Sequence, residues 1–249
     1  MRKFVHGWQP DLPDHRDWKF SPRLQRVPKA VDLRPHCPAV VDQGQLGSCT
    51  GNSSANAFKF TLMKEGLTVF DPSRLFIYYN GRSLEGTTKQ DAGAEIRDVI
   101  KGIATKGVCD EREWAYNIAK FATRPTAKCY KDALANIATS YLRLDNSNLQ
   151  TLKGCLADGY PFVFGFTVYE SFESDEVART GVVPMPGLDE KSLGGHAVLC
   201  VGYDTASKRF LVMNSWGTGW GQKGFFTIPF AYLTDTNLAD DFWTVRIVK

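Results

Sequence analysis

The sequence predicts an α+β fold, with helices in the first part of the chain and antiparallel strands in the second. Two patterns lead to this prediction. Up to Gly159, apolar residues recur at the spacing of a helix face, and glycines follow the last turns. Beyond Gly159, apolar residues gather in short segments rich in Val, Phe and Tyr. The 249 residues suffice for one large domain or two small ones with a full core.

Glycine marks the end of each expected helix. The first helix runs from Cys49 to Glu65 and stops at Gly66, and the second ends at the pair Asn80-Gly81. The expected helices cover residues 49–65, 71–79, 96–106 and 147–158. The expected strands cover residues 162–168, 196–203, 209–213, 224–228 and 243–248.

The composition limits the classes of partner that the chain is expected to bind. A net charge of +3 gives no reason to expect nucleic acid or an anionic membrane surface. No run of about 20 apolar residues is present, so no bilayer-spanning helix is expected. The N-terminal segment has a basic start without an apolar region, so we expect no secretory signal, and the cytoplasm is favoured. We expect a monomer.

The six cysteines show neither the density of a disulfide framework nor the spacing of a zinc site. Cys155 lies in a helical pattern and Cys200 in an apolar strand pattern, so both are expected to be small buried residues. We therefore expect a mostly reduced protein, with no metal and no organic cofactor.

Cys49 is the expected nucleophile. It lies in the first turn of a helix, where unpaired N–H groups favour a negative charge. An imidazolium beside it would push the thiol further toward thiolate. The small residues Gly44, Gly47 and Ser48 precede it and let a substrate carbonyl approach closely. A helical cysteine is otherwise a core residue, so the assignment depends on partners elsewhere in the chain.

Those partners are an imidazole and two amides. His196 follows Cys49 by 147 residues and is expected to act as general base and acid. Asn214 follows 18 residues later, and its side-chain oxygen would fix the tautomer of the imidazole. The Gln43 amide would join the Cys49 N–H in stabilising a tetrahedral oxyanion.

These stretches resemble the papain family of cysteine peptidases over nearly all of residues 30–230, and the Cys–His–Asn spacing agrees with that family's pattern. Further likeness lies in Val31-Asp32-Leu33-Arg34, Gly159-Tyr160-Pro161-Phe162 and Gly202-Tyr203-Asp204. The resemblance implies a two-lobed fold, with the active-site cleft between a helical N-terminal lobe and an antiparallel β-sheet C-terminal lobe.

The resemblance also implies roles by position. Cys49 matches the nucleophile, His196 the base, Asn214 the orienting amide and Gln43 the oxyanion glutamine. Five further residues are expected to bind a polypeptide substrate: Gly93, Ala94, Gly194, Gly195 and Trp216. Two departures are visible. Thr50 stands where the family usually has tryptophan, and Leu46 replaces a cysteine, so the family's disulfide at that site cannot form.

The chain differs from most of the family in its leader. We expect a propeptide-like segment at residues 1–27, as in short-leader bacterial or viral relatives, and a peptidase domain at residues 28–249. Within the domain, residues 28–145 form the mainly helical lobe and residues 146–249 the mainly β lobe. Prolines in the leader favour extended chain. It either blocks the cleft, or packs Trp8 and Trp18 on the outside of a lobe.

The leading hypothesis is a thiol endopeptidase, which forms an acyl-enzyme on Cys49 and is regulated by its leader. A deamidase or amide transferase with the same machinery is one alternative. Transglutaminase-type sites tend to use aspartate as third member, whereas this chain has Asn214. An inactive papain-like binding module is the other alternative, although such modules usually lose the nucleophile or the histidine.

Overall fold

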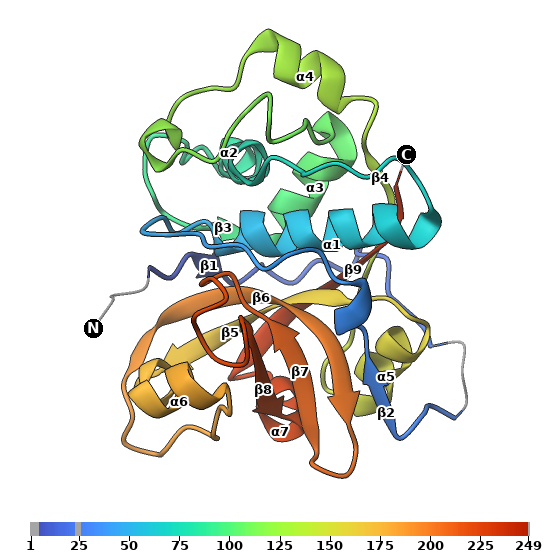
Figure 1. Cartoon of the computed structure of the whole chain (residues 1–249), viewed down its shortest axis with the longest axis vertical. Coiled ribbons are helices and arrows are strands. Elements are labelled where there is room, and N and C mark those ends of the chain that lie inside the picture. The colour runs from blue at the N-terminus through green and yellow to red at the C-terminus, as the bar shows by residue number, and fades with distance from the viewer. Residues whose placement is uncertain (1–4, 23–25, 249) are drawn as a thin grey trace.

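The computed structural model describes residues 5–22 and 26–248. Helices α1 to α4 lie on one side of the molecule with β4 beside them, and most of the main sheet lies on the other side with α5 to α7 (Figure 1). This arrangement confirms the predicted α+β fold. The helices are α1 Cys49–Glu65, α2 Arg74–Glu85, α3 Ile96–Lys106, α4 Ala127–Ala133, α5 Leu149–Ala157, α6 Asp175–Thr180 and α7 Phe230–Thr234. Short 3-10 helices are η1 Arg34–His36, η2 Ile118–Lys120 and η3 Glu170–Glu173.

The main sheet is antiparallel, with strands in the order β4-β9-β5-β6-β7-β8, and β2 also pairs with β6. These strands are β2 Ala30–Asp32, β4 Ala138–Arg143, β5 Phe162–Tyr169, β6 Ser192–Asp204, β7 Arg209–Met213, β8 Phe225–Pro229 and β9 Ala239–Val248. A second, two-stranded sheet pairs β1 Trp8–Gln9 with β3 Ala94–Glu95 in parallel.

Local sequence signals predict the end of α1 correctly but not the end of α2. α1 begins at Cys49 and ends at Gly66, whose φ of 66° lies in the left-handed region, as predicted. The predicted end of α2 is wrong, because the helix continues to Gly86. Gly81 lies inside it and faces α3, where an added Cβ would stand 2.6 Å from Val99 Cγ2. That glycine permits close helix packing and does not stop the helix.

A segment near each end of the chain packs in the lobe to which the sequence did not assign it. β2 lies in the part expected to be helical, yet Val31 pairs with Tyr203 of β6. At the other end, Val245 and Val248 of β9 belong to the core of the helical lobe. The division at residue 145 therefore describes the middle of the chain and not its ends.

A third apolar cluster lies between the cores of the two lobes and includes Cys49, Ile100, Val163 and Ala197. Trp8 of the leader belongs to it and is buried. The leader is thus part of the packing between the lobes.

All six cysteines are free thiols. No helix among residues 5–22 and 26–248 is both long and apolar enough to cross a membrane.

Candidate active site

The expected catalytic side chains meet where α1 packs against β6. Cys49 begins α1, His196 lies on β6, and Asn214 follows β7. Asn214 Oδ1 lies 2.8 Å from His196 Nε2. Cys49 lies in the same apolar cluster as Ala197, the residue next to His196, and the Ala197 N–H lowers the pKa of the Cys49 thiol. The fold therefore brings the thiol, the imidazole and the orienting amide together.

The Trp216 ring covers the imidazole. The ring centroids of Trp216 and His196 are 4.8 Å apart, and their planes differ by 23°. Both side chains are buried, as is Asn214. The hydrogen bond between His196 and Asn214 is thus shielded from solvent.

Gln43 lies in the loop before α1 and connects this loop to the β lobe. Its Oε1 accepts a hydrogen bond from Ser215 Oγ at 2.7 Å. Its Nε2 donates to Leu46 O at 3.0 Å and to the leader carbonyl of Val5 at 3.1 Å. The Gln43 amide therefore already holds a peptide carbonyl oxygen in the cleft.

The leader fills the cleft as an extended strand. The Ala94 N–H donates to Gly7 O at 2.8 Å, within the pairing of β1 with β3. The Gly7 backbone N–H lowers the pKa of the Cys49 thiol. The contact is so close that a Cβ at Gly93 would overlap the Gly7 carbonyl. Gly93 and Ala94 thus bind a peptide backbone, here that of the leader.

Trp8 enters a pocket of the β lobe between β5 and β6. A Cβ at Gly165 would overlap its indole ring, and one at Gly195 would stand 2.6 Å from its Cε3. Its Nε1 donates to Asp241 Oδ2 at 2.9 Å. Trp18, in contrast, is 69% exposed. Of the two placements considered for the leader, the structure has the one in the cleft.

His6 covers the other side of the site. Its Nε2 lies 2.7 Å from Glu173 Oε1, and its ring centroid is 6.0 Å from that of His196 and 6.2 Å from that of Trp216. A Cβ at Gly194 would stand 3.1 Å from His6 Cβ. All five residues expected to bind substrate therefore lie along the leader.

Burial shifts the pKa values of Cys49 and His196 in opposite directions. Loss of solvent raises the pKa of the Cys49 thiol to about 11, although backbone hydrogen bonds from Ala197 and Gly7 oppose the rise. Burial, and next the charge of His6, lower the pKa of His196 to about 3. Both shifts oppose the ionised thiolate–imidazolium pair expected for catalysis, so the ionised pair stays a prediction.

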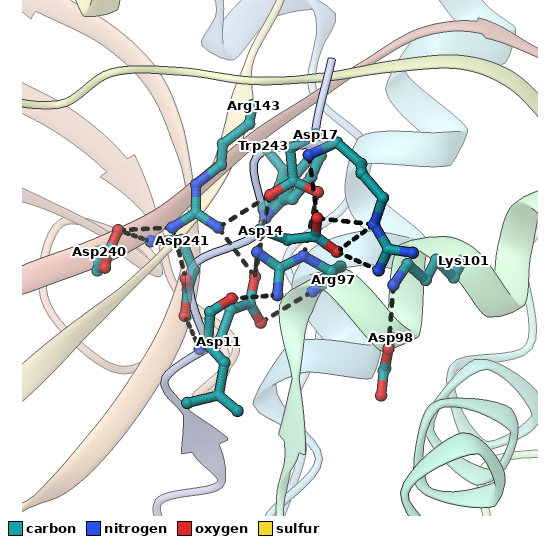
Figure 2. A network of polar contacts seen from close by, with 12 residues as sticks. Asp11, Asp14, Asp17, Arg97, Asp98, Lys101, Arg143, Asp240, Asp241 and Trp243 are labelled. Carbon is teal, nitrogen blue, oxygen red and sulfur yellow. Dashed lines mark hydrogen bonds and ion pairs between the residues drawn. The ribbon is translucent and has the colours of Figure 1, made fainter. Parts of the chain in front are cut away.

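A buried polar network anchors the leader beyond Trp8 (Figure 2). The Asp11 N–H donates to Asp241 Oδ2 at 2.8 Å, and Asp11 Oδ1 accepts from the Arg97 N–H at 3.2 Å. Asp17 pairs with Arg97 at 2.7 Å and with Arg143 at 3.4 Å. Arg97 belongs to α3 and Arg143 to β4, so the leader ties the helical lobe to the sheet.

The sequence did not reveal two further groups that support the site. Tyr116 Oη donates to Gln43 O at 2.8 Å and lies 2.5 Å from Ser48 Oγ. Asp91 accepts from the Gly47 N–H at 2.9 Å. Both reach the loop before Cys49 from distant segments, and no local motif marks either of them.

Comparison with known proteins decides the family. The family model described as papain family cysteine protease matches residues 27–240. An uncharacterized peptidase C1-like protein of Acanthamoeba polyphaga mimivirus is 44% identical over 228 residues, which cover 88% of this chain and 73% of that protein. The chain belongs to the papain family of cysteine proteases. It is thus a papain-like cysteine peptidase, a hydrolase, as the sequence predicted.

Other members of the papain family resemble the chain to different degrees. The crystal structure of xylellain, a cysteine protease from Xylella fastidiosa, has a TM-score of 0.94 and 41% identity, and covers 100% of this chain and 98% of that one. Cathepsin K of Mus musculus is 29% identical over 225 residues, which cover 84% of this chain. The chain spans only 62% of the length of that cathepsin.

Proposed function

We propose that this papain-family peptidase is an endopeptidase held inactive by its own leader, residues 5–17. The hydrogen bond from Gln43 Nε2 to Val5 O is the observation that carries the proposal. It puts a peptide carbonyl against the expected oxyanion donor, while Gly7 presents an N–H to the sulfur. The leader therefore occupies the place in which a polypeptide substrate would have its backbone recognised.

The path of the leader supports endopeptidase action. It passes the catalytic pair as an extended strand, from Val5 at Gln43 to Asp11 at Arg97. The cleft thus accepts an internal stretch of chain on both sides of Cys49. A peptidase that removes single terminal residues needs a cleft closed at one end, whereas residues 5–11, which pass this site, are an internal stretch of chain.

The proposed chemistry starts when a substrate replaces the leader. The Ala94 N–H binds the substrate backbone, and the Cys49 thiolate attacks the scissile carbonyl. Gln43 Nε2 and the Cys49 N–H stabilise the oxyanion. His196 then protonates the leaving amine and afterwards activates water to hydrolyse the thioester. Asn214 holds the imidazole in the tautomer that this proton transfer requires.

Removal of the leader also restores the ionised pair. Water then reaches Cys49 and His196, and the burial that separates their pKa values is relieved. The charge of His6 near the imidazole leaves with the leader. In this proposal the leader inhibits in two ways, because it occupies the substrate site and opposes ionisation of the pair.

Two tryptophans of the leader provide a matched test. Truncating a buried aromatic side chain costs about 3–5 kcal/mol, so Trp8→Ala should weaken docking of the leader by roughly a hundredfold or more. We expect Trp8→Ala to hydrolyse a fluorogenic peptide much faster than wild type, whereas Trp18→Ala should match wild type. Adding Cys49→Ala to Trp8→Ala should abolish turnover.

Each part of the proposal can fail separately. Equal, high turnover by wild type and Trp8→Ala would refute inhibition by the leader. Release of ammonia without new amino termini would replace peptidase action by deamidation, the alternative considered above.

A further inference from the structure

Two buried thiols of the helical lobe face each other away from the cleft residues. Cys109 follows α3, and Cys129 lies in α4. Both belong to the core of that lobe, and each is 1% exposed. Their Sγ atoms and a carboxylate oxygen of Glu113 all lie within 4.8 Å of one another. The catalytic proposal uses none of these three groups.

We propose that Cys109 and Cys129 are a modification site, at which exchange with a small-molecule disulfide such as glutathione disulfide forms a reversible intramolecular disulfide. The sulfur atoms need to move less than about 3 Å to reach the bonded separation of about 2.05 Å. Rotation of the two side chains provides a displacement of that size. This inference is independent of the proposed function of the cleft.

The surroundings favour a disulfide over a bound metal ion. Cys129 Sγ lies 3.2 Å from Thr126 Oγ1 and 3.8 Å from Glu113 O, so Glu113 turns its backbone carbonyl toward this sulfur. The Glu113 carboxylate instead pairs with Lys128 at 2.7 Å. Structural zinc sites use four ligands, and this cluster offers two buried thiols and one carboxylate already paired with a lysine.

The reaction is a pair of thiol–disulfide exchanges. One protein thiolate attacks a sulfur of glutathione disulfide, which forms a mixed disulfide and releases one glutathione. The second protein thiolate attacks the protein sulfur of that mixed disulfide and releases the other glutathione. Two thiol protons and two electrons leave the protein, and glutathione disulfide is reduced to two glutathione molecules.

Burial controls the rate of this exchange. Burial raises the pKa of the Cys109 thiol well above its usual range, and the neighbouring Cys129 thiol adds to the rise. Since only the thiolate attacks, exchange requires the intervening segment to open toward solvent. Residues 110–126 contain one short 3-10 helix, η2, and no strand longer than a single bridge. Opening this segment breaks backbone hydrogen bonds such as that from Glu111 N–H to Asp71 O at 2.7 Å, so we expect the exchange to be slow.

The disulfide would tie down a segment that supports the catalytic loop. Tyr116 lies between the two cysteines in sequence, and its Oη contacts both Gln43 O and Ser48 Oγ. Closing a loop of about 20 residues restricts the unfolded chain and stabilises the folded one. Oxidation should therefore raise the thermal stability of the lobe that carries Tyr116.

The test uses the full-length protein with Cys49→Ser, which removes the reactive cleft thiol. It is equilibrated in glutathione buffers of increasing oxidised fraction, alkylated and mapped by mass spectrometry. We expect a Cys109–Cys129 linked peptide that has lost two hydrogen atoms, and a Tm about 6–12 °C above that of the reduced protein. Neither should occur in Cys109→Ser or in Cys129→Ser.

The half-buried Cys37 is an internal control for exposure to the oxidant. Free thiols, or separate glutathione adducts, at Cys109 and Cys129 under conditions that modify Cys37 would overturn the proposal. A rise in Tm with added Zn²⁺ that both serine substitutions remove, without any linked peptide, would identify a metal site and equally overturn it. Since no outcome depends on peptide hydrolysis, failure here leaves the proposed function standing.

Discussion

The Trp8 indole lies against Gly165 so closely that a Cβ atom at this glycine would overlap the ring. Trp8 belongs to the leader and Gly165 to β5, so this contact joins the leader to the sheet that carries His196. A substitution at Gly165 should therefore displace Trp8 while the sequence of the leader stays unchanged.

Gly165→Ala should release the leader. The added methyl group takes the space of the ring, and overpacking costs typically 1–3 kcal/mol, so turnover of a fluorogenic peptide should rise by roughly 10- to 100-fold. Gly219→Ala is the matched control, because nothing lies within 4 Å of its Cβ position. Steady-state kinetics check this, and equal rates for the two variants would show that Trp8 does not gate the cleft.

The oxyanion role of Gln43 predicts a loss in kcat and not in KM. In the Gly165→Ala background, Gln43→Ala should lower kcat by about 10²–10³-fold, because the donor acts mainly in the transition state. Ser215→Ala separates this role from structural support, since it removes only the hydrogen bond to Gln43 Oε1. It should lower kcat by less than about tenfold. Similar losses in both variants would argue for a structural role of Gln43.

The buried carboxyls under the leader predict a pH dependence of stability. Burial raises the pKa of Asp241 to about 7 and that of Asp11 to about 6. The folded state therefore binds these protons more tightly than the unfolded state, whose carboxyls have a pKa of about 3.9. This contribution to the free energy of unfolding is full below about pH 4 and is lost as the pH rises to about 7.

Asp241→Asn should remove the part of that dependence due to Asp241. Asparagine keeps an acceptor for Trp8 Nε1 and tolerates the φ of 59° at this position. Between pH 5 and pH 7, wild type should lose on the order of 1 kcal/mol per pH unit relative to the variant. Urea unfolding at several pH values measures this difference. A constant difference across the range would show that Asp241 is ionised throughout.

Local signals made much of the fold predictable. Cys49 and Gly66 mark both ends of α1, and β7 has the predicted bounds because its apolar run is short and flanked by turns. The end of α2 was wrongly predicted at Gly81, because the sequence does not distinguish a glycine at a helix crossing from a glycine that ends a helix. β4 was missed because, after Ala138, its residues are exposed or half-buried, so no alternation marks it.

The catalytic groups could be named from the sequence, but their state could not. Motifs around Cys49, His196 and Asn214 identified the groups, and the fold brings them together. Burial opposes ionisation of the thiol, and Trp8 of the leader lies in the same apolar cluster as Cys49, by a contact that no spacing encodes. The anchoring network likewise joins residues from separate segments and leaves no local pattern.

The most direct test is the pH profile of Cys49 alkylation by iodoacetamide, with the site identified by mass spectrometry. The account predicts that wild type reacts slowly at neutral pH and faster only as the pH rises toward about 11. Gly165→Ala should react rapidly near pH 6–7, where thiolates paired with an imidazolium already exist. Rapid alkylation of wild-type Cys49 at pH 6, at the rate of Gly165→Ala, would contradict a neutral pair closed by the leader.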